Sequence, residues 1–367
     1  IGSNSINTVS YYLACLKKGS IPLLLPENIK TKQLIDYISR FSPFAIFSDN
    51  QLVIDCDKFK IFNRSYIYFY NEYFSSASKL PALLLTTSGS TGSPKVVVLS
   101  EENIISNTKS IIDYLSISSK DKHITTLPFN YTYGLSCINT HLYSKASIIL
   151  NNYSVITSDF WELVRNRKPT TISGVPYTYE ILCRLGIDNL PLDTIEKFTQ
   201  AGGKLSNKYL KIMSKFLSKN NKELFVMYGQ TEATARMSYL PSKYLMDKIG
   251  SIGIPIPGGS FCLSNTKEYS KKANLSVGEL IYNGPNVSLG YATNCLDIAK
   301  DFNPRDSLET GDLAYEDEEG FYYICGRKSR FAKISGNRFS LDDIQELVPD
   351  KFNSAVVSDD INIYIFI

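Results

Sequence analysis

The first part of the chain alternates between helix-forming and strand-forming segments, and this alternation restricts the fold more than any other feature. Apolar residues recur with helical spacing in 7–18 and in 31–39, and each helix-like segment precedes a short apolar run, SIPLLLP (20–26) or FAIFSD (44–49). A second stretch of this kind runs from about 148 to 229. Because such alternation is typical of helices packed on parallel strands, the sequence predicts an α/β fold with largely parallel sheets.

The pattern changes from about residue 250, where short β-rich runs alternate with glycine, proline and asparagine turns. This pattern indicates a small antiparallel β-barrel or sandwich. We therefore expect an N-terminal domain over 1–327, with two α/β subdomains to about 245 and the barrel at about 250–327. From 328, a loop, a helix in LDDIQELV and two strands predict the start of a small α+β C-terminal domain at 328–367.

Composition and charge are those of an ordinary soluble globular protein. The 367 residues are 43% hydrophobic and 20% charged, and the net charge of +3 is too small to indicate a nucleic-acid partner. The lysine-rich run at 208–223 has Leu210, Met213, Phe216 and Leu217 at helical spacing, so we predict a helix with its lysines in solvent. No apolar run approaches the ~20 residues of a membrane span.

Cysteine and histidine usage restricts the chemistry. The seven cysteines are scattered without metal-like pairing, which favours free thiols in a reducing, cytoplasmic setting. With two histidines, a histidine metal site or a catalytic triad is unfavourable. The chain starts without methionine and stops inside the apolar run INIYIFI, so we expect further residues at both ends.

A loop rich in serine, threonine and glycine, TTSGSTGSPK (86–95), lies between the strand-like runs LLL and VVVLS. Its glycines allow backbone N–H groups to approach anionic oxygens, and Lys95 adds a positive charge. The spacing differs from that of a Walker A motif, and a strand rather than a helix follows, which disfavours a P-loop phosphotransferase. Taken alone, the loop fits either a mobile phosphate-binding hairpin or a surface turn.

Other motifs follow in a defined order along nearly the whole chain. They are LKKGSIPLLLP (16–26), LPFNYTYGLS (127–136), QAGGKLS (200–206), MYGQTEAT (227–234), GSIGIPIPG (250–258), GELIYNGPNVSLGY (278–291), ETGDLAYEDEEGFYYICGR (309–327) and KISGNRFSLDDIQE (333–346). Together with the phosphate-type loop, this series resembles the adenylate-forming superfamily of acyl-CoA synthetases, luciferase-like enzymes and peptide-synthetase adenylation domains.

The resemblance implies an AMP-forming acid–thiol ligase. A carboxylate would attack the α-phosphorus of ATP to give acyl-AMP and pyrophosphate, and a thiol or an amine would then take the acyl group. The implied cofactors are ATP and Mg²⁺, with coenzyme A or a phosphopantetheine carrier as acceptor. The implied partners are a small carboxylic acid and, for the second acceptor, an acyl carrier protein. Gathering negative charge at one phosphorus requires charge neutralisation and positioning above all.

The resemblance also implies roles for individual residues. Lys95, Thr231 and Glu232 would be catalytic, with Thr231 bonding the α-phosphate and Glu232 holding Mg²⁺. Asp312 would accept bonds from both ribose hydroxyls, and Arg327 would reach the ribose or a phosphate. Further ATP contacts would come from the phosphate loop (Thr87, Ser88, Gly89, Ser90, Thr91, Gly92) and from the adenine side (Gly202, Gly203, Tyr228, Gly229).

The acid pocket would be built from Asn130, Tyr131, Gly134, Gly174 and Val175, although each position fits plain core packing as well. Members that activate α-amino acids commonly carry an aspartate where this chain has Asn130, and a neutral amide pairs less strongly with an ammonium. The sequence therefore disfavours an ordinary α-amino acid as the substrate.

Two departures from the family pattern keep an alternative open. The chain stops before the late lysine that members carry in the C-terminal domain, and Ser329 occupies the hinge position that is usually Asp or Lys. A degenerate adenylate-binding module without full ligase activity is therefore the alternative to a ligase.

Overall fold

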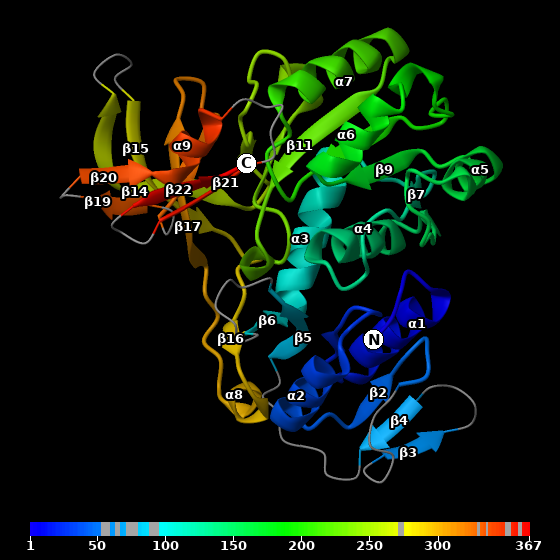
Figure 1. Cartoon of the computed structure of the whole chain (residues 1–367). Helices are drawn as coiled ribbons and strands as arrows, with labels where there is room; N and C mark the ends of the chain where they lie inside the picture. Colours follow the sequence, from blue (N-terminus) through cyan, green and yellow to red (C-terminus); the bar gives the residue numbers. More distant parts are fainter. Residues whose placement is uncertain are drawn as a thin grey trace.

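The computed structural model describes residues 1–52, 59–62, 67–70, 80–87, 95–270, 275–328, 331–334, 337–348, 354–358 and 362–367. These residues form the mixed α/β structure that the sequence predicts (Figure 1). The expectation of largely parallel sheets is wrong for the first part of the chain, because the two sheets that contain the strands of 20–26 and 44–49 are mainly antiparallel. The helices are α1 (Ile6–Lys18), α2 (Thr31–Phe41), α3 (Glu101–Leu115), α4 (Thr132–Tyr143), α5 (Ser158–Arg167), α6 (Pro176–Arg184), α7 (Asn207–Asn220), α8 (Cys295–Ala299) and α9 (Leu341–Glu346).

The loop expected to bind phosphate is the connection of a β-hairpin. Its strands β5 (Pro81–Thr86) and β6 (Val96–Ser100) pair antiparallel, and β1 (Leu23–Leu24) and β16 (Gly290–Ala292) complete the sheet. All five residues of β6 are buried, which explains the run VVVLS. Ser100 then caps α3: its Oγ accepts from the Asn103 N–H, and the Asn103 side chain accepts from the Ser100 N–H. The predicted strand and cap are confirmed.

A second small sheet lies in the N-terminal part. It is formed by β2 (Ala45–Phe47), β4 (Ile67–Tyr70) and β3 (Phe59–Phe62), in that order. Figure 1 shows α1 and α2 near this region, and α3 beside α4 between the β5–β6 hairpin and the large sheet.

The seven-stranded sheet explains why motifs far apart in sequence meet. Its order is β13 (Ile254–Pro255), β12 (Ser238–Leu240), β11 (Glu223–Tyr228), β10 (Lys197–Gln200), β9 (Thr171–Gly174), β7 (Lys122–Ile124) and β8 (Ser147–Ile149). The strands from β8 to β11 run parallel, whereas β12 and β13 are antiparallel. Parallel neighbours end at one edge, so Gly174, Gln200 and Tyr228 lie together there.

The lysine-rich helix is α7, and the apolar residues predicted to face the core are buried, which confirms the prediction. Leu210, Met213, Phe216 and Leu217 belong to the same core cluster as Phe198 of β10 and Leu224 of β11. None of the helices in the described ranges combines the length and the hydropathy needed to cross a membrane.

The region after residue 250 contains a four-stranded antiparallel sheet, in the order β14 (Ser260–Ser270), β15 (Leu275–Asn283), β17 (Ser307–Glu316) and β18 (Tyr322–Arg327). Beyond it come the helix and the two strands that the sequence predicts, α9 and the pair β21 (Ala355–Ser358) and β22 (Ile363–Phe366). The segment expected to be a loop also contains a hairpin, β19 (Phe331–Ile334) with β20 (Asn337–Ser340).

The two histidines are buried against each other where α4 contacts the seven-stranded sheet. The ring centroids of His123 in β7 and His141 in α4 are 4.9 Å apart, and the Thr171 hydroxyl lies 3.2 Å and 3.3 Å from their nearest ring nitrogens. Burial lowers the pKa of each histidine to about 3; for His141 the charge of the neighbouring His123 adds to this.

We therefore expect the free energy of unfolding to fall as the pH drops from 6.5 to 5. The unfolded chain binds a proton at each histidine in this window and the folded chain does not, so each contributes about 1.4 kcal/mol per pH unit. Urea denaturation at several pH values measures this slope. His123→Gln should remove about half of it, whereas an unchanged slope would show that His123 is protonated in the folded state. Between pH 7 and 8 the free energies of unfolding of wild type and variant should change with pH in parallel.

Candidate active site

YGQTE begins at Tyr228, the last residue of β11, and the loop that follows is held in place by buried side-chain amides. Asn286 Nδ2 donates to the carbonyls of Ala233 (2.8 Å) and Arg236 (3.1 Å), and Asn107 Nδ2 of α3 donates to the Arg236 carbonyl (2.8 Å). A Cβ on Gly229 would lie 1.7 Å from the Ala235 carbonyl oxygen, so only glycine fits there. These contacts determine where the side chains of the motif point.

Two of the predicted catalytic residues begin a short 3-10 helix, Thr231–Ala233. Thr231 Oγ1 lies 2.9 Å from Thr132 Oγ1 at the start of α4. The Tyr291 hydroxyl donates to Glu232 Oε1 (2.7 Å), and the Lys95 ammonium lies 5.5 Å from the centroid of the same tyrosine ring. Tyr291 therefore connects Lys95 with Glu232.

Tyr291 was missed as a site residue. It is the last residue of GELIYNGPNVSLGY, a motif that contributed to the family resemblance but to no predicted site residue. Its role becomes visible because β16 pairs with β6, with Tyr291 opposite Val97, next to the strand that Lys95 precedes. A polar aromatic residue at the end of a motif is the one signal that could have drawn attention to it.

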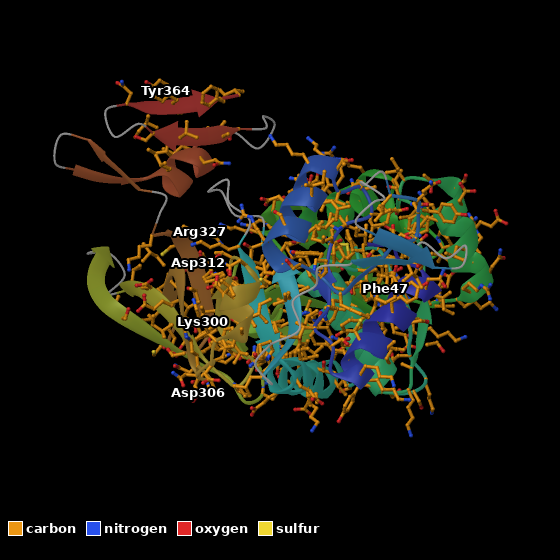
Figure 2. All side chains as sticks on the ribbon, turned by 90° about the horizontal axis from the view of Figure 1, so that it is seen from below. Phe47, Lys300, Asp306, Asp312, Arg327 and Tyr364 are labelled. Carbon is orange, nitrogen blue, oxygen red and sulfur yellow. The ribbon has the colours of Figure 1, made fainter. Side chains whose placement is uncertain are left out.

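Asp312 is a buried carboxylate surrounded by donors. Its side chain is 3% exposed, and it accepts from the Tyr228 hydroxyl (2.5 Å) and Gln230 Nε2 (3.1 Å) on Oδ2 and from Arg327 Nε (2.8 Å) on Oδ1. Asp312 and Arg327 are paired across β17 and β18, and Figure 2 shows the two side by side where the chain continues to the C-terminal strands. Burial and the neighbouring Asp312 raise the pKa of Tyr228 well above its usual range, so Tyr228 stays a donor.

The adenine-side loop meets the acid motif. Gly202 has φ 82°, and a Cβ there would lie 2.6 Å from Tyr131 Oη and 3.3 Å from Val175 Cγ1. Gly203 follows with φ 159° and accepts from Gln200 Nε2 through its carbonyl (2.9 Å). The predicted adenine loop and two of the predicted pocket residues are thus in contact.

Close packing explains why the other two predicted pocket positions, 134 and 174, are occupied by glycine. A Cβ on Gly134 would lie 2.4 Å from the Pro128 carbonyl oxygen, and one on Gly174 would lie 2.8 Å from Thr178 Cβ. Both glycines therefore permit close approach of α4 and α6 to their neighbours. Asn130 is half-buried, immediately before Tyr131, the N-cap residue of α4.

The predicted phosphate loop lies only partly within the described residues. Thr87 is half-buried directly after β5, and Lys95 is exposed directly before β6. The other predicted residues of this loop lie outside the described residues; they are Ser88, Gly89, Ser90, Thr91 and Gly92.

The order of these motifs on this fold defines the adenylate-forming class of proteins. The model of the AMP-binding enzyme family matches residues 1–292. The chain belongs to this family.

Curated relatives and solved structures agree with this assignment. The long-chain-fatty-acid–CoA ligase of Bacillus subtilis is 27% identical over 271 residues, covering 72% of this chain and 47% of the relative. The 2-succinylbenzoate–CoA ligase of Oceanobacillus iheyensis is 24% identical over 95% of this chain and 72% of the relative. This chain therefore spans about half the length of the first relative.

A solved structure shares the fold. The O-succinylbenzoate coenzyme A synthetase of Bacillus subtilis, in complex with ATP and magnesium ion, superposes with a TM-score of 0.75 at 22% identity. The match covers 97% of this chain and 75% of that one.

Proposed function

We propose that this protein activates a carboxylic acid with ATP, forms acyl-AMP and pyrophosphate, and transfers the acyl group to the thiol of coenzyme A. The family match and the two CoA ligases among its relatives support this proposal. They lend no support to the alternative of a degenerate nucleotide-binding module.

One observation carries the proposal. Residues from four separate motifs converge in two connected clusters: Tyr228 and Gln230 with Asp312, and Thr231 and Glu232 with Thr132 and Tyr291. Because Tyr228 to Glu232 are five consecutive residues, the buried carboxylate and the threonine pair flank a single short loop. That arrangement suits a ligand with a ribose at one end and phosphates at the other.

Each side chain then has a distinct task. Asp312 accepts the ribose hydroxyls, which requires Arg327 to shift from Oδ1 toward solvent or toward a phosphate; its side chain is 58% exposed, so it has room to move. The hydroxyls of Thr231 and Thr132 donate to the α-phosphate as negative charge builds up. Lys95 neutralises the departing pyrophosphate, and Tyr131 with Val175 borders the acid beside Gly202.

Magnesium fits the residues present. Glu232 offers a carboxylate oriented by Tyr291, and Mg²⁺ is commonly bound by one or two carboxylates together with substrate phosphates. When bound there, Mg²⁺ would supply charge neutralisation at the phosphates.

The direct test is acid-dependent ATP–pyrophosphate exchange, followed by thioester formation with coenzyme A. We expect exchange with at least one acid from a panel of fatty, aryl, hydroxy, amino and dicarboxylic acids, and thioester formation with that acid. ATP binding without exchange for any acid would contradict the ligase proposal. Exchange followed by transfer only to a phosphopantetheine carrier or to an amine would contradict coenzyme A as the acceptor.

Asp312→Ala should weaken ATP binding by about 100-fold, because bonds from two ribose hydroxyls to a charged acceptor are lost. Isothermal titration calorimetry measures the affinity. Glu279→Ala is the matched control, since Glu279 is also a buried carboxylate of this sheet, paired with Lys328 (2.8 Å), and has no assigned ligand. Equal affinities for the Asp312 variant and wild type would rule out the ribose assignment.

Tyr291→Phe should raise the Mg²⁺ concentration that gives half-maximal exchange about threefold to tenfold. It removes one hydrogen bond to a partly exposed carboxylate and keeps the ring beneath Lys95. Exchange rates over a magnesium titration provide the measurement. Tyr153→Phe, at a tyrosine that is 54% exposed, should leave the titration curve unchanged. If Tyr291→Phe also leaves it unchanged, Tyr291 does not orient Glu232.

A further inference from the structure

Arg236 is a buried cation whose partners are all neutral. The residue is 2% exposed; Nη1 donates to the Tyr114 hydroxyl (3.1 Å) and Met227 Sδ (2.7 Å), and Nη2 donates to Ser136 Oγ (3.1 Å). The guanidinium carbon lies 4.5 Å from the centroid of the Tyr133 ring. Within the described ranges, the Nε–H has no hydrogen-bond acceptor, and the groups that interact most strongly with the charge are Tyr114, Cys137 and Tyr133 rather than a carboxylate.

A buried charge of this kind is costly unless something compensates for it. Removing a guanidinium from water costs several kcal/mol, and neutral hydroxyls and a thioether recover only part of that loss. Arginine also keeps its charge, since its pKa is too high for neutralisation by proton loss. A carboxylate that met the fork of donors would compensate both the charge and the unused Nε–H.

The position of Arg236 suits contact with the far end of a substrate. Thr132 touches Thr231 at the start of α4, and Ser136, which bonds Arg236, lies one turn further along the same helix. Four residues of α-helix correspond to a rise of ~6 Å. Arg236 therefore contacts α4 about one helical turn further along than the threonine pair assigned to the α-phosphate.

The surroundings of Arg236 continue into the predicted acid pocket. Tyr133, Cys137 and Met227, which contact the guanidinium, share one apolar cluster with Tyr131 and Val175. The charge of Arg236 also opposes the effect of burial that raises the pKa of Tyr131. Apolar surroundings with one fixed cation favour an acid whose distal end is anionic over one whose distal end is neutral.

The backbone directly before Arg236 is strained. Thr234 has φ 62° and Ala235 has φ 148°, both in the region that favours glycine. Such conformations persist only where surrounding contacts enforce them, and they are concentrated at binding and catalytic sites. Here the Asn107 and Asn286 bonds to the Arg236 carbonyl hold the strained turn and direct the guanidinium inward.

We propose that Arg236 binds a second carboxylate of the substrate, so that the acid activated by this protein is a dicarboxylic acid. The proposal rests on the proposed acid–CoA ligase function and adds the class of acid. One carboxylate would be activated beside Thr231, and the other would pair with the Arg236 guanidinium through its Nε side.

The test compares acids matched in length: succinate and glutarate with butyrate and valerate, and phthalate with benzoate. Wild type should exchange best with a dicarboxylate. Arg236→Met, which keeps an apolar stem of similar length, should lower kcat/KM for that dicarboxylate about 100-fold and leave the matched monocarboxylate and the ATP affinity nearly unchanged. Arg236→Lys should retain part of the preference. Arg184→Met, at an exposed arginine, is the matched control and should behave as wild type.

A purely structural role would instead lower the thermal midpoint and reduce exchange with all acids alike. The inference is overturned if wild type exchanges equally well with the matched monocarboxylate. It is also overturned if Arg236→Met leaves the ratio of kcat/KM for the dicarboxylate to kcat/KM for the monocarboxylate unchanged. Either outcome leaves the ligase function intact. If wild type exchanges with no acid, the ligase function fails. Calorimetry of the same acids with α,β-methylene-ATP then decides the inference: dicarboxylate binding lost in Arg236→Met supports it, and equal binding by both proteins overturns it.

Discussion

The buried amide bonds that hold the loop after β11 are the constraint on which the site depends. Asn107 reaches it from α3 and Asn286 from the segment before β16, so three parts of the chain meet at one turn. Buried polar groups are costly when unpaired and rigid when satisfied. The network therefore gives the loop one conformation, in which Tyr228 turns toward Asp312 and Thr231 toward Thr132.

The site contains two buried charges, and their hydrogen-bond partners differ in kind. Asp312 is surrounded by donors from Tyr228, Gln230 and Arg327, so its charge is fully supported before any ligand arrives. Arg236 has neutral partners and an unused donor among the described residues. Asp312 is therefore a preorganised acceptor, whereas Arg236 has a donor that an anion could bind. The proposed nucleotide end at Asp312 and the proposed acid end at Arg236 rest on this difference.

Much of the fold followed from local pattern. Helical spacing predicted α7 with its buried face, and Ser100 predicted the start of α3, because both depend on interactions within a few residues. The hairpin β19–β20 was missed although Ser-Gly at 335–336 is a turn signal, because its strands FAKI and NRFS lack a regular alternation of apolar and polar residues. The division into domains at about residue 327 stays a prediction. Gly134 was predicted to line the acid pocket, but a side chain at this position would also clash with the Pro128 carbonyl oxygen. Steric packing alone is therefore a sufficient reason for glycine there.

The sequence alone determined the family and the order of the motifs, and it predicted the residues proposed to bind nucleotide, because those signals are short and contiguous. Tertiary structure alone decided which side chains support them. Tyr291 reaches Glu232 only through the pairing of β16 with β6, and Arg236 reaches α4 only through a strained turn held by asparagines from distant segments. No local pattern encodes such contacts, because whether a charge is buried and what it faces depend on which elements pack around it.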